Sequence, residues 1–454
     1  MPILPRRAPG RGLSPFPRPF VCQSCQRSLR RFSVTSGRAD TAATDAATDA
    51  ATTTTTTSTA TAIAPPPPSG YALLTSRRLI SLSGPDAPRF LHGLITQPVT
   101  EEPGSGSARQ RHSTPGAPSR VSLAAGAVGF YSGFLNATGR VLHDVFVYRD
   151  TLGLSSAEGK AFIVEVDAAQ VHTLAQHFKR YKLRSKLSFR VLDEGEASAW
   201  QVWDGTSSSS SSYSSPLLPE HSQLSRLKNS IVLPDTRAPG MGHRVIDYGG
   251  AKGLDLDLER SDDSAYRVRR YLLGVAEGQA EIPREQALPL EANMDLMGGI
   301  DFRKGCYVGQ ELTIRTRHRG VVRKRILPCL LYPSSPSPPE KLEYRPYITE
   351  GEGQENLSAE NVPSGLSIGR DGAKGRSAGT WLRGVGNIGL ALCRLQIMTD
   401  VELPGETAVG APFDPKRDEF VVKWGVDEEG SEGQSVKIKA FVPDWMREKL
   451  QEEK

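Results

Sequence analysis

The chain has 454 residues, enough for two or three domains, and its apolar fraction of 38% is low for a compact protein. Its formal charge of +5 arises at the N-terminus: residues 1–39 hold eight Arg, no Lys and no acid, and the rest of the chain carries −3. Nucleic-acid-binding proteins concentrate positive charge on the folded body, so we expect no nucleic-acid partner. No run of 18 apolar residues occurs, and we expect no membrane span.

Residues 1–39 have the composition of a mitochondrial transit peptide, rich in Arg and Ser and free of acids. We expect import into the mitochondrial matrix and cleavage between Arg31 and Ala39; a disordered basic tail is the alternative. Cys22 and Cys25 have zinc or redox spacing, but they lie inside this leader, where two further ligands are lacking. We therefore expect no metal site there.

Four segments have the composition of disordered chain. Residues 40–68 consist largely of Thr, Ala and Pro, and this composition predicts a linker. The other three are predicted to be disordered inserts on the surface of folded domains, and they lie at 103–119, 206–216 and 333–379.

The first folded segment is predicted to begin with a strand and a helix. Residues 79–82 are expected to form the strand, and the turn at 84–86 precedes the helix. The residues that this helix is expected to bury are Phe90, Leu91 and Leu94.

A hairpin, a helix and further strands are predicted next. Residues 131–135 and 141–148 are expected to pair through the turn at 136–139, and 162–164 form another strand. Asp167 is a candidate cap for a helix with one apolar face, made of Val171, Leu174, Phe178 and Tyr181. A strand follows, with the alternating residues Leu187, Phe189 and Val191.

The second half shows fewer clear strands. Ser261 or Asp263 is expected to cap a helix whose apolar face consists of Val268, Tyr271, Leu272 and Val275. The last 75 residues contain short alternating runs, and one of them comprises Val436, Ile438, Ala440 and Val442. Such runs predict a small antiparallel barrel, so the fold class is α+β with a β-rich C-terminal domain.

One eight-residue motif identifies a family. Residues 304–311 read Lys-Gly-Cys-Tyr-Val-Gly-Gln-Glu and match the KGCYxGQE motif of the YgfZ-like family of folate-binding proteins. Four further stretches resemble that family in the same order, at 83–93, 134–144, 181–186 and 266–283. The resemblance covers 70–330 and, more weakly, 380–445.

The resemblance implies the α+β, GcvT/YgfZ-like folate-binding fold, which is related to the glycine-cleavage aminomethyltransferase. This module is expected at 69–325, in two halves at 69–205 and 225–325. A small C-terminal antiparallel β-barrel is expected at 326–447.

The resemblance also implies a role as a mitochondrial matrix factor late in iron–sulfur cluster biogenesis. It would support [4Fe–4S] cluster insertion into enzymes such as aconitase and radical-SAM synthases, and it would be a non-catalytic or weakly catalytic maturation factor, with residual folate-dependent transferase activity as an open alternative. The implied partners are A-type iron–sulfur scaffold proteins and [4Fe–4S] client enzymes, and the implied cofactor is tetrahydrofolate or a related reduced folate. Because the body of the chain has no cluster-ligand spacing of cysteines, no stably bound iron–sulfur cluster is expected.

Cys306 is the candidate reactive thiol. Lys304 lies two residues before it, and a nearby cation favours the reactive thiolate. The same thiol is a candidate for transient contact with a cluster. The alternative is a small buried residue in a tight turn between glycines.

The resemblance places a folate-binding cleft between the two halves of the module. The candidate cofactor-binding residues are Arg140, Asp144, Glu291, Asn293, Lys304, Tyr307, Gln310, Glu311, Arg315 and Arg317. The amide of Gln310 and the carboxylate of Glu311 suit the donor and acceptor edge of a pterin. A hydrogen-bonded pair that braces the turn is the alternative.

Two further observations bear on this cleft. If residues 313–319 form a strand, Arg315, Arg317 and Arg319 share one face and favour the carboxylates of a folate tail or of an acidic partner. A solvated face is the alternative. The aminomethyltransferase has two adjacent acids where this chain has His143 and Asp144, which argues against aminomethyl transfer. Asp144 could still form a hydrogen bond to a ligand, and an ion pair with Arg140 is the alternative.

Three functions therefore stay open. The first is an assembly factor with a folate-sized cleft, the second a folate-dependent one-carbon transferase, and the third a non-catalytic interaction scaffold with a vestigial pocket. Turnover of an aminomethyl-lipoyl substrate with tetrahydrofolate would distinguish the enzyme from the other two.

Overall fold

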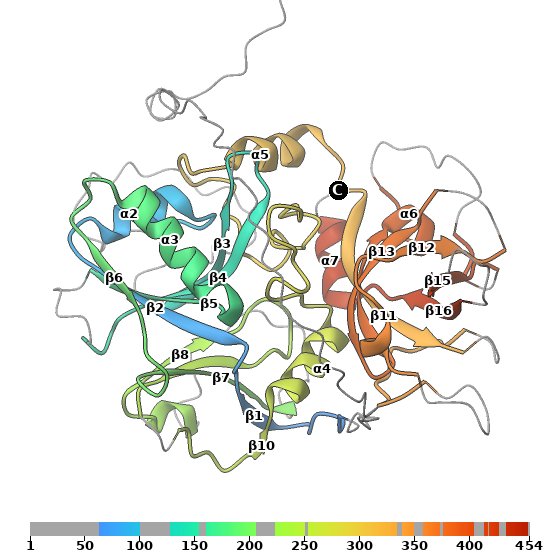
Figure 1. The fold of residues 1–454 in the computed structure, drawn as a ribbon, viewed down its shortest axis with the longest axis horizontal. Helices are drawn as coiled ribbons and strands as arrows, with labels where there is room; N and C mark the ends of the chain where they lie inside the picture. The colour runs from blue at the N-terminus through green and yellow to red at the C-terminus, as the bar shows by residue number, and fades with distance from the viewer. Residues whose placement is uncertain are drawn as a thin grey trace, which may run out of the picture. The chain divides into compact units, whose positions relative to one another are not determined.

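The computed structural model describes residues 63–99, 128–153, 160–205, 223–249, 253–333, 338–348, 357–372, 376–403, 413–415, 417–425 and 433–452. The predicted leader with Cys22 and Cys25, most of the linker at 40–68, and the inserts at 103–119 and 206–216 lie outside these residues. The described strands form two five-stranded sheets and a closed six-stranded barrel (Figure 1).

The first sheet has the strand order β3-β4-β5-β2-β6 and is antiparallel throughout. Its strands are β2 (Arg77–Ser83), β3 (Gly129–Leu135), β4 (Val141–Arg149), β5 (Ala161–Asp167) and β6 (Ser188–Val191). The helices α2 (Ala87–Leu94) and α3 (Val171–Lys182) bury their apolar residues in the same hydrophobic cluster as the strands. This packing confirms the predicted strands, the hairpin and both helices.

The second sheet has the order β10-β1-β7-β9-β8. Its strands are β1 (Gly70–Leu73), β7 (Ser198–Trp203), β8 (Ser230–Pro234), β9 (His243–Asp247) and β10 (Glu259–Ser261). β1 runs parallel to β10 and antiparallel to β7, so Gly70 pairs with both Glu259 and Trp203. The two halves expected at 69–205 and 225–325 are thus interleaved in one sheet.

Helix α4 (Asp263–Leu273) confirms the helix predicted in the second half but not its cap. The carboxylate of Asp262 accepts the backbone N–H of Ala265 at 2.9 Å. Ser261 and Asp263 are therefore not the cap, because the capping side chain belongs to the residue immediately before the first helical turn. Gly274, with φ +73°, ends the helix in the left-handed conformation.

The strand considered at 313–319 is wrong, because residues 310–319 form helix α5 (Gln310–Arg319). Its first turn holds the acid Glu311 and its last turn holds three basic residues, which complements the helix dipole. On a helix, Arg315 and Arg319 share one face, whereas Arg317 lies on another.

The C-terminal domain is the predicted antiparallel barrel, and its closed strand order is β11-β14-β13-β12-β15-β16. The strands are β11 (Lys324–Tyr332), β12 (Ser367–Arg370), β13 (Gly379–Val385), β14 (Ile388–Arg394), β15 (Phe420–Trp424) and β16 (Gln434–Ala440). The disordered insert expected at 333–379 is wrong in part, because η5 (Ala359–Asn361) and β12 lie within it. β12 joins β13 to β15, and its Ile368 is fully buried, so barrel closure orders this polar stretch.

Helix α7 (Asp444–Glu452) attaches the barrel to the rest of the chain. The indole N–H of Trp445 donates to the carbonyl of Leu273 at 3.0 Å, and the ammonium of Lys449 donates to the carbonyl of Leu296 at 2.6 Å. The end of the expected linker is also ordered, because the carbonyl of Pro67 accepts the indole N–H of Trp203 at 2.9 Å. None of the described helices combines the length and apolar character needed to cross a membrane.

Candidate functional site

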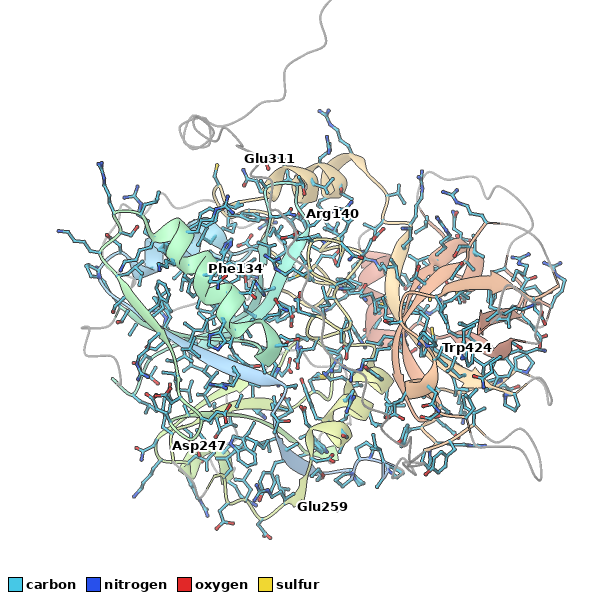
Figure 2. All side chains as sticks on the ribbon, in the orientation of Figure 1. Phe134, Arg140, Asp247, Glu259, Glu311 and Trp424 are labelled. Carbon is cyan, nitrogen blue, oxygen red and sulfur yellow. The ribbon has the colours of Figure 1, made fainter. Side chains whose placement is uncertain are left out.

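Residues 304–309, which we call the Cys306 loop, connect the segment after residue 298 to α5. The tip of the β3–β4 hairpin lies next to this loop and to the first turn of α5. Figure 2 labels Arg140 at the hairpin and Glu311 in that first turn, and both labels lie near α5. The structure thus brings one predicted hairpin residue close to the motif.

Lys304 anchors one end of the Cys306 loop. Its ammonium donates to the carbonyl oxygens of His92 at 2.7 Å, Ile95 at 2.6 Å and Gln97 at 3.2 Å. The first two carbonyls lie at the C-terminal end of α2, where the negative pole of the helix favours a cation. Burial lowers the pKa of Lys304 to about 7, and the nearby carboxylate of Asp301 opposes this shift. Lys304 is therefore committed to holding the loop against α2.

Two glycines fix the other end of the loop. Gly309 has φ +82° at the start of α5, and a Cβ atom there would lie 2.3 Å from the carbonyl oxygen of Asn136. Gly139 also has φ +82°, and its Cβ would lie 2.7 Å from the Cβ of Leu312. Only glycine allows both the backbone conformation and this close approach of hairpin and helix.

Cys306 is exposed on this loop, and its thiol is free. Of the described cysteines, Cys329 and Cys393 are buried inside the barrel, with 3.8 Å between their sulfur atoms. The interpretation of Cys306 as a small buried residue is therefore wrong. A Cβ atom on the neighbouring Gly305 would lie 3.8 Å from the Nε2 atom of His92, so an imidazole lies close to the exposed turn.

Tyr307 and Gln310 brace the loop from inside. The ring of Tyr307 is buried, and the ammonium of Lys304 lies 4.7 Å from its centroid. The side-chain oxygen of Gln310 accepts the backbone N–H of Tyr307 at 3.3 Å. Gln310 is thus a structural brace of the turn, whereas Glu311 is exposed.

The exposed side of α5 is basic. Arg315 and Arg319 are exposed on one face of the helix. The guanidinium of Arg317 lies over the ring of Phe302, 5.2 Å from its centroid. Arg140 is also exposed, and its guanidinium donates to the carbonyl of Gln286 at 2.5 Å. These cations make the exposed side of α5 positive, whereas the acid Glu311 lies in its first turn, next to the Cys306 loop.

Asp144 is not part of this surface, because it lies in a buried cluster of ion pairs. One of its carboxylate oxygens lies 3.3 Å from the guanidinium of Arg77, and the other accepts the N–H of Gly278 at 3.1 Å. Burial raises the pKa of Asp144, and Arg77 opposes that shift. The other members of the cluster are Glu165, Asp235, Arg237, Arg244, Arg270, Glu277 and Glu281.

Glu277 lies at the centre of the buried cluster. One of its oxygens lies 2.7 Å from Arg237 and 2.6 Å from Arg244, and it accepts the hydroxyl of Tyr266 at 2.9 Å. Burial alone would raise the pKa of Glu277, but the surrounding arginines hold it well below its usual range. The cluster ties together strands of both sheets and α4. Sequence reasoning missed it, although charged residues inside apolar strands, such as Glu165 in β5, were a signal.

Glu291 and Asn293 lie at the junction with the barrel. The carboxylate of Glu291 lies 3.5 Å from the ammonium of Lys324, and the side-chain amide of Asn293 donates to the carbonyl of Ile326 at 2.6 Å. Asp144, Asn293 and Lys304, and the side-chain oxygen of Gln310, thus make hydrogen bonds within the protein. These contacts leave those four side chains fewer polar atoms for a ligand, and folate binding stays a prediction.

Comparison with known proteins agrees with this architecture. Residues 323–448 match the family described as CAF17, C-terminal beta-barrel domain. The fold is also similar to a crystal structure of the glycine cleavage system aminomethyltransferase T from Bartonella henselae, with a TM-score of 0.50 over 83% of this chain and 86% of that one. The sequences are 11% identical, so this likeness concerns the fold alone.

Curated relatives match nearly the whole chain. A protein of Chaetomium globosum is 50% identical over 392 residues, 84% of each chain, and one of Neurospora crassa is 42% identical over 440 residues, 95% of this chain and 88% of the relative. A protein of Pyricularia oryzae is 50% identical over 384 residues. Each is named iron–sulfur cluster assembly factor IBA57 homolog, mitochondrial. The chain belongs to this family of mitochondrial IBA57 homologues, with a GcvT-like fold and a CAF17-type C-terminal barrel.

Proposed function

We propose that the protein acts in the mitochondrial matrix at a late stage of iron–sulfur cluster assembly and supports [4Fe–4S] cluster insertion into client enzymes. The names of the relatives support a role in mitochondrial cluster assembly. The acid-free leader supports import into the matrix with cleavage of a transit peptide.

The observation that carries the proposal is the presentation of Cys306. Its thiol is exposed on a loop held at one end by three carbonyl bonds to Lys304 and at the other by the glycine contact with the hairpin. A thiolate is the preferred protein ligand of an iron–sulfur cluster. A fixed, exposed thiol is suited to bind a cluster as cargo for a short time.

A cluster needs more ligands than one thiol, and we propose that an A-type scaffold protein supplies the others. Arg315 and Arg319 give a positive charge to the exposed face of α5, the helix that follows the Cys306 loop. Such a surface favours an acidic partner, because complementary charge speeds encounter and fixes orientation. The cluster would then be shared between the two proteins before it reaches the client enzyme.

Binding of a reduced folate stays a prediction of the family resemblance, and the alternative of a folate-dependent one-carbon transferase depends on it. The engaged atoms of Asp144, Asn293 and Gln310 argue against that reaction. Calorimetric titration with tetrahydrofolate, together with an aminomethyl-lipoyl turnover assay, tests binding and chemistry separately.

The proposal is tested in cells that lack the protein. Wild type should restore aconitase activity and lipoylation, and Cys306→Ala and Cys306→Ser should both fail while melting at the same temperature as wild type. The matched control is Arg303→Ala, an exposed residue of the preceding turn, which should restore both activities. A [2Fe–2S] enzyme measured in parallel should be unaffected by depletion. Equal loss of both enzyme classes, or full rescue by both cysteine variants, would contradict the proposal.

A further inference from the structure

The turn that follows α3 presents an apolar side chain to solvent. Leu183 is 85% exposed, whereas the next most exposed large apolar residue of the described chain, Leu152, is 38% exposed. Packing therefore does not explain why a leucine occupies this position. One exposed leucine is ordinary on a protein surface, so its meaning depends on its conformation and on the residues around it.

The backbone holds Leu183 in place. Its φ of +45° and ψ of −111° lie in a region that favours glycine, so the conformation is strained for leucine. The N–H of Ser185 donates to the carbonyl of Lys182 at 2.8 Å, and the N–H of Lys186 donates to the carboxylate of Asp86 at 2.6 Å. The turn is thus fixed to the start of α2, and the leucine points outward on a rigid support.

The surroundings of Leu183 are strongly basic. Residues 168–192 contain no acid, and the cations on and beside the turn are Arg89, Lys179, Arg180, Lys182, Arg184 and Lys186. Two of the acids that follow this segment pair with other arginines: Glu194 binds Arg78, and Glu196 binds Arg190. We call Leu183 and these six cations the α3 tip.

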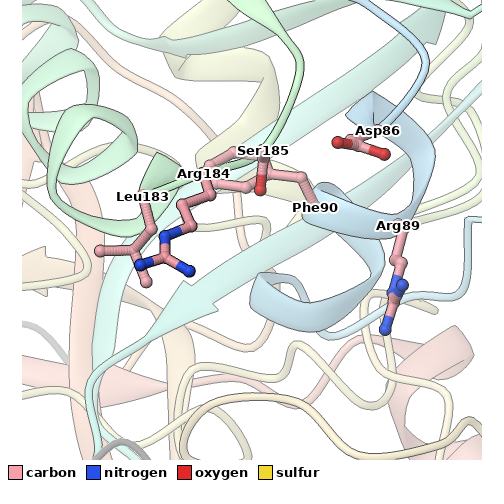
Figure 3. Close-up of a pocket in the computed structure, with 6 residues that line it drawn as sticks. All are labelled: Asp86, Arg89, Phe90, Leu183, Arg184 and Ser185. Atoms are coloured by element: carbon pink, nitrogen blue, oxygen red, sulfur yellow. The ribbon is translucent and has the colours of Figure 1, made fainter.

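A surface hollow of about 680 Å³ lies beside the leucine. Its lining residues are Asp86, Arg89, Phe90, Leu183, Arg184 and Ser185. Figure 3 shows that they come from two segments, the start of α2 and the turn after α3. Arg89 and Arg184 line the hollow from the two segments, and guanidinium groups bind phosphate well. Asp86, the acid of the hollow, is held by the N–H of Lys186.

We propose that the α3 tip binds peripherally to an anionic phospholipid surface. Leu183 enters the boundary between headgroups and acyl chains, and the six cations lie against the phosphates. The six cations supply most of the attraction to anionic lipid, and the leucine adds a small area of buried apolar surface.

An acidic protein partner is the other occupant that this charge would suit, but the shape favours a membrane. Leu183 stands out from the surface, and a protein partner would need a matching pocket to receive it. A bilayer accepts one protruding apolar side chain without such a pocket.

The position of the α3 tip has a consequence for the Cys306 loop. The N-terminal end of α2 lines the hollow, and its C-terminal end supplies carbonyls to Lys304. A helix of eight residues is about 12 Å long. Binding through the α3 tip would therefore hold the exposed thiol close to the membrane surface.

The experiment measures sedimentation of the full chain with vesicles of phosphatidylcholine that contain cardiolipin, and with phosphatidylcholine vesicles alone. Wild type should bind the cardiolipin vesicles, and Leu183→Asp and the double variant Arg180→Glu, Arg184→Glu should each lower the partition coefficient about tenfold. The matched control for charge is Arg376→Glu with Lys423→Glu, two exposed cations of the barrel domain, which should bind as wild type. The basic leader is the same in every variant, so differences arise from the α3 tip.

Leu183→Gly separates binding from folding. Glycine relieves the strained backbone, so this variant should melt at a higher temperature than wild type while it binds cardiolipin vesicles less well. Equal binding of wild type and both Leu183 variants would overturn the proposal, as would equal binding of wild type to the two kinds of vesicle. Loss of affinity of Leu183→Asp for an A-type scaffold, without loss of vesicle binding, would overturn it in favour of a protein partner. None of these outcomes depends on the role proposed for Cys306.

Discussion

The Cα atom of Gly139, at the tip of the β3–β4 hairpin, lies 3.3 Å from the position that a Cβ atom would take on Gly309 at the start of α5. The two glycines stand far apart in the sequence, and each has a backbone conformation that side chains disfavour. Their contact sets the distance between the hairpin and the Cys306 loop.

Gly309→Ala should therefore lower the free energy of unfolding by about 3 kcal/mol or more, because strain at φ +82° adds to a clash with the carbonyl of Asn136. Gly298→Ala is the matched control. Gly298 has φ +71° but open space around it, so its loss should be about 1 kcal/mol. Urea unfolding of both variants gives the comparison, and equal losses would show that the contact with the hairpin does not matter.

Lys304→Met should release the loop from α2. The carbonyls of His92, Ile95 and Gln97 lose their shared donor, and the expected loss of stability is about 2–4 kcal/mol. Hydrogen exchange at the amide of Val308, which donates to the carbonyl of Gly93 at 3.2 Å, should become faster. Arg303→Met, at the exposed neighbouring position, should leave both quantities unchanged. Unchanged exchange in Lys304→Met would mean that the loop is held by other contacts.

Glu277→Gln should be strongly destabilising. It removes the negative charge that faces Arg237 and Arg244 and leaves these guanidinium groups poorly compensated in the interior, with an expected loss of about 3–5 kcal/mol. Glu285→Gln is the control, because that carboxylate is half exposed and pairs with Arg284 near the surface, where an ion pair contributes about 0–1 kcal/mol. Chemical denaturation would measure both, and a loss below that of the control would disprove the central role of Glu277.

Acidification should weaken the fold through buried histidines. Burial lowers the pKa of His143 to about 3 and that of His177 to about 4, both below the usual value of 6.5. The unfolded chain then takes up protons that the folded chain does not, so the free energy of unfolding decreases as the pH falls below about 6.5. His143 alone lowers the free energy of unfolding by about 2 kcal/mol between pH 7 and pH 5.

His143→Phe should flatten that dependence, because phenylalanine does not titrate and the position faces Phe134 in the sheet. His172→Phe, at an exposed position of α3, is the control and should keep the wild-type slope. Melting temperatures of wild type and of both variants, measured at pH 7, 6 and 5, give the slopes to be compared. A wild-type slope in His143→Phe would assign the acid sensitivity to other groups.

Local signals in the sequence predicted most of the first sheet. The apolar spacing of Val171, Leu174 and Phe178 and the turn at 136–139 are properties of short stretches, and they led to the observed helix and hairpin. The barrel was predicted only in outline. β12 has few apolar residues of its own, and its order depends on neighbours that come later in the chain.

The candidate site was predicted in part. The motif indicated Lys304 and Cys306, but the sequence could not show that Lys304 binds carbonyl groups at the end of α2. His92, one of these partners, precedes Lys304 by 212 residues. Asp144 was predicted to bind a ligand. Its ion-pair partner, Arg77, lies on another strand far away in the sequence, so the sequence alone could not reveal the pair. The strand at 313–319 was considered because three arginines alternate there. The acid in the first turn and the basic residues in the last turn are the pattern that favours a helix.

The pairing of β1 determines when the second sheet can finish folding. β1 is the first described strand, yet both of its neighbours come late, since Gly70 pairs with Trp203 and with Glu259. A chain that emerges from its N-terminus, whether from a ribosome or from a membrane channel, therefore carries an unpaired strand edge until β10 has followed. Pairing over such long stretches is slow, and an open edge invites aggregation while it waits. We expect the nascent chain to depend on chaperones until residue 261 is available, after which closure of the sheet buries Tyr71 and Ala72 in one step.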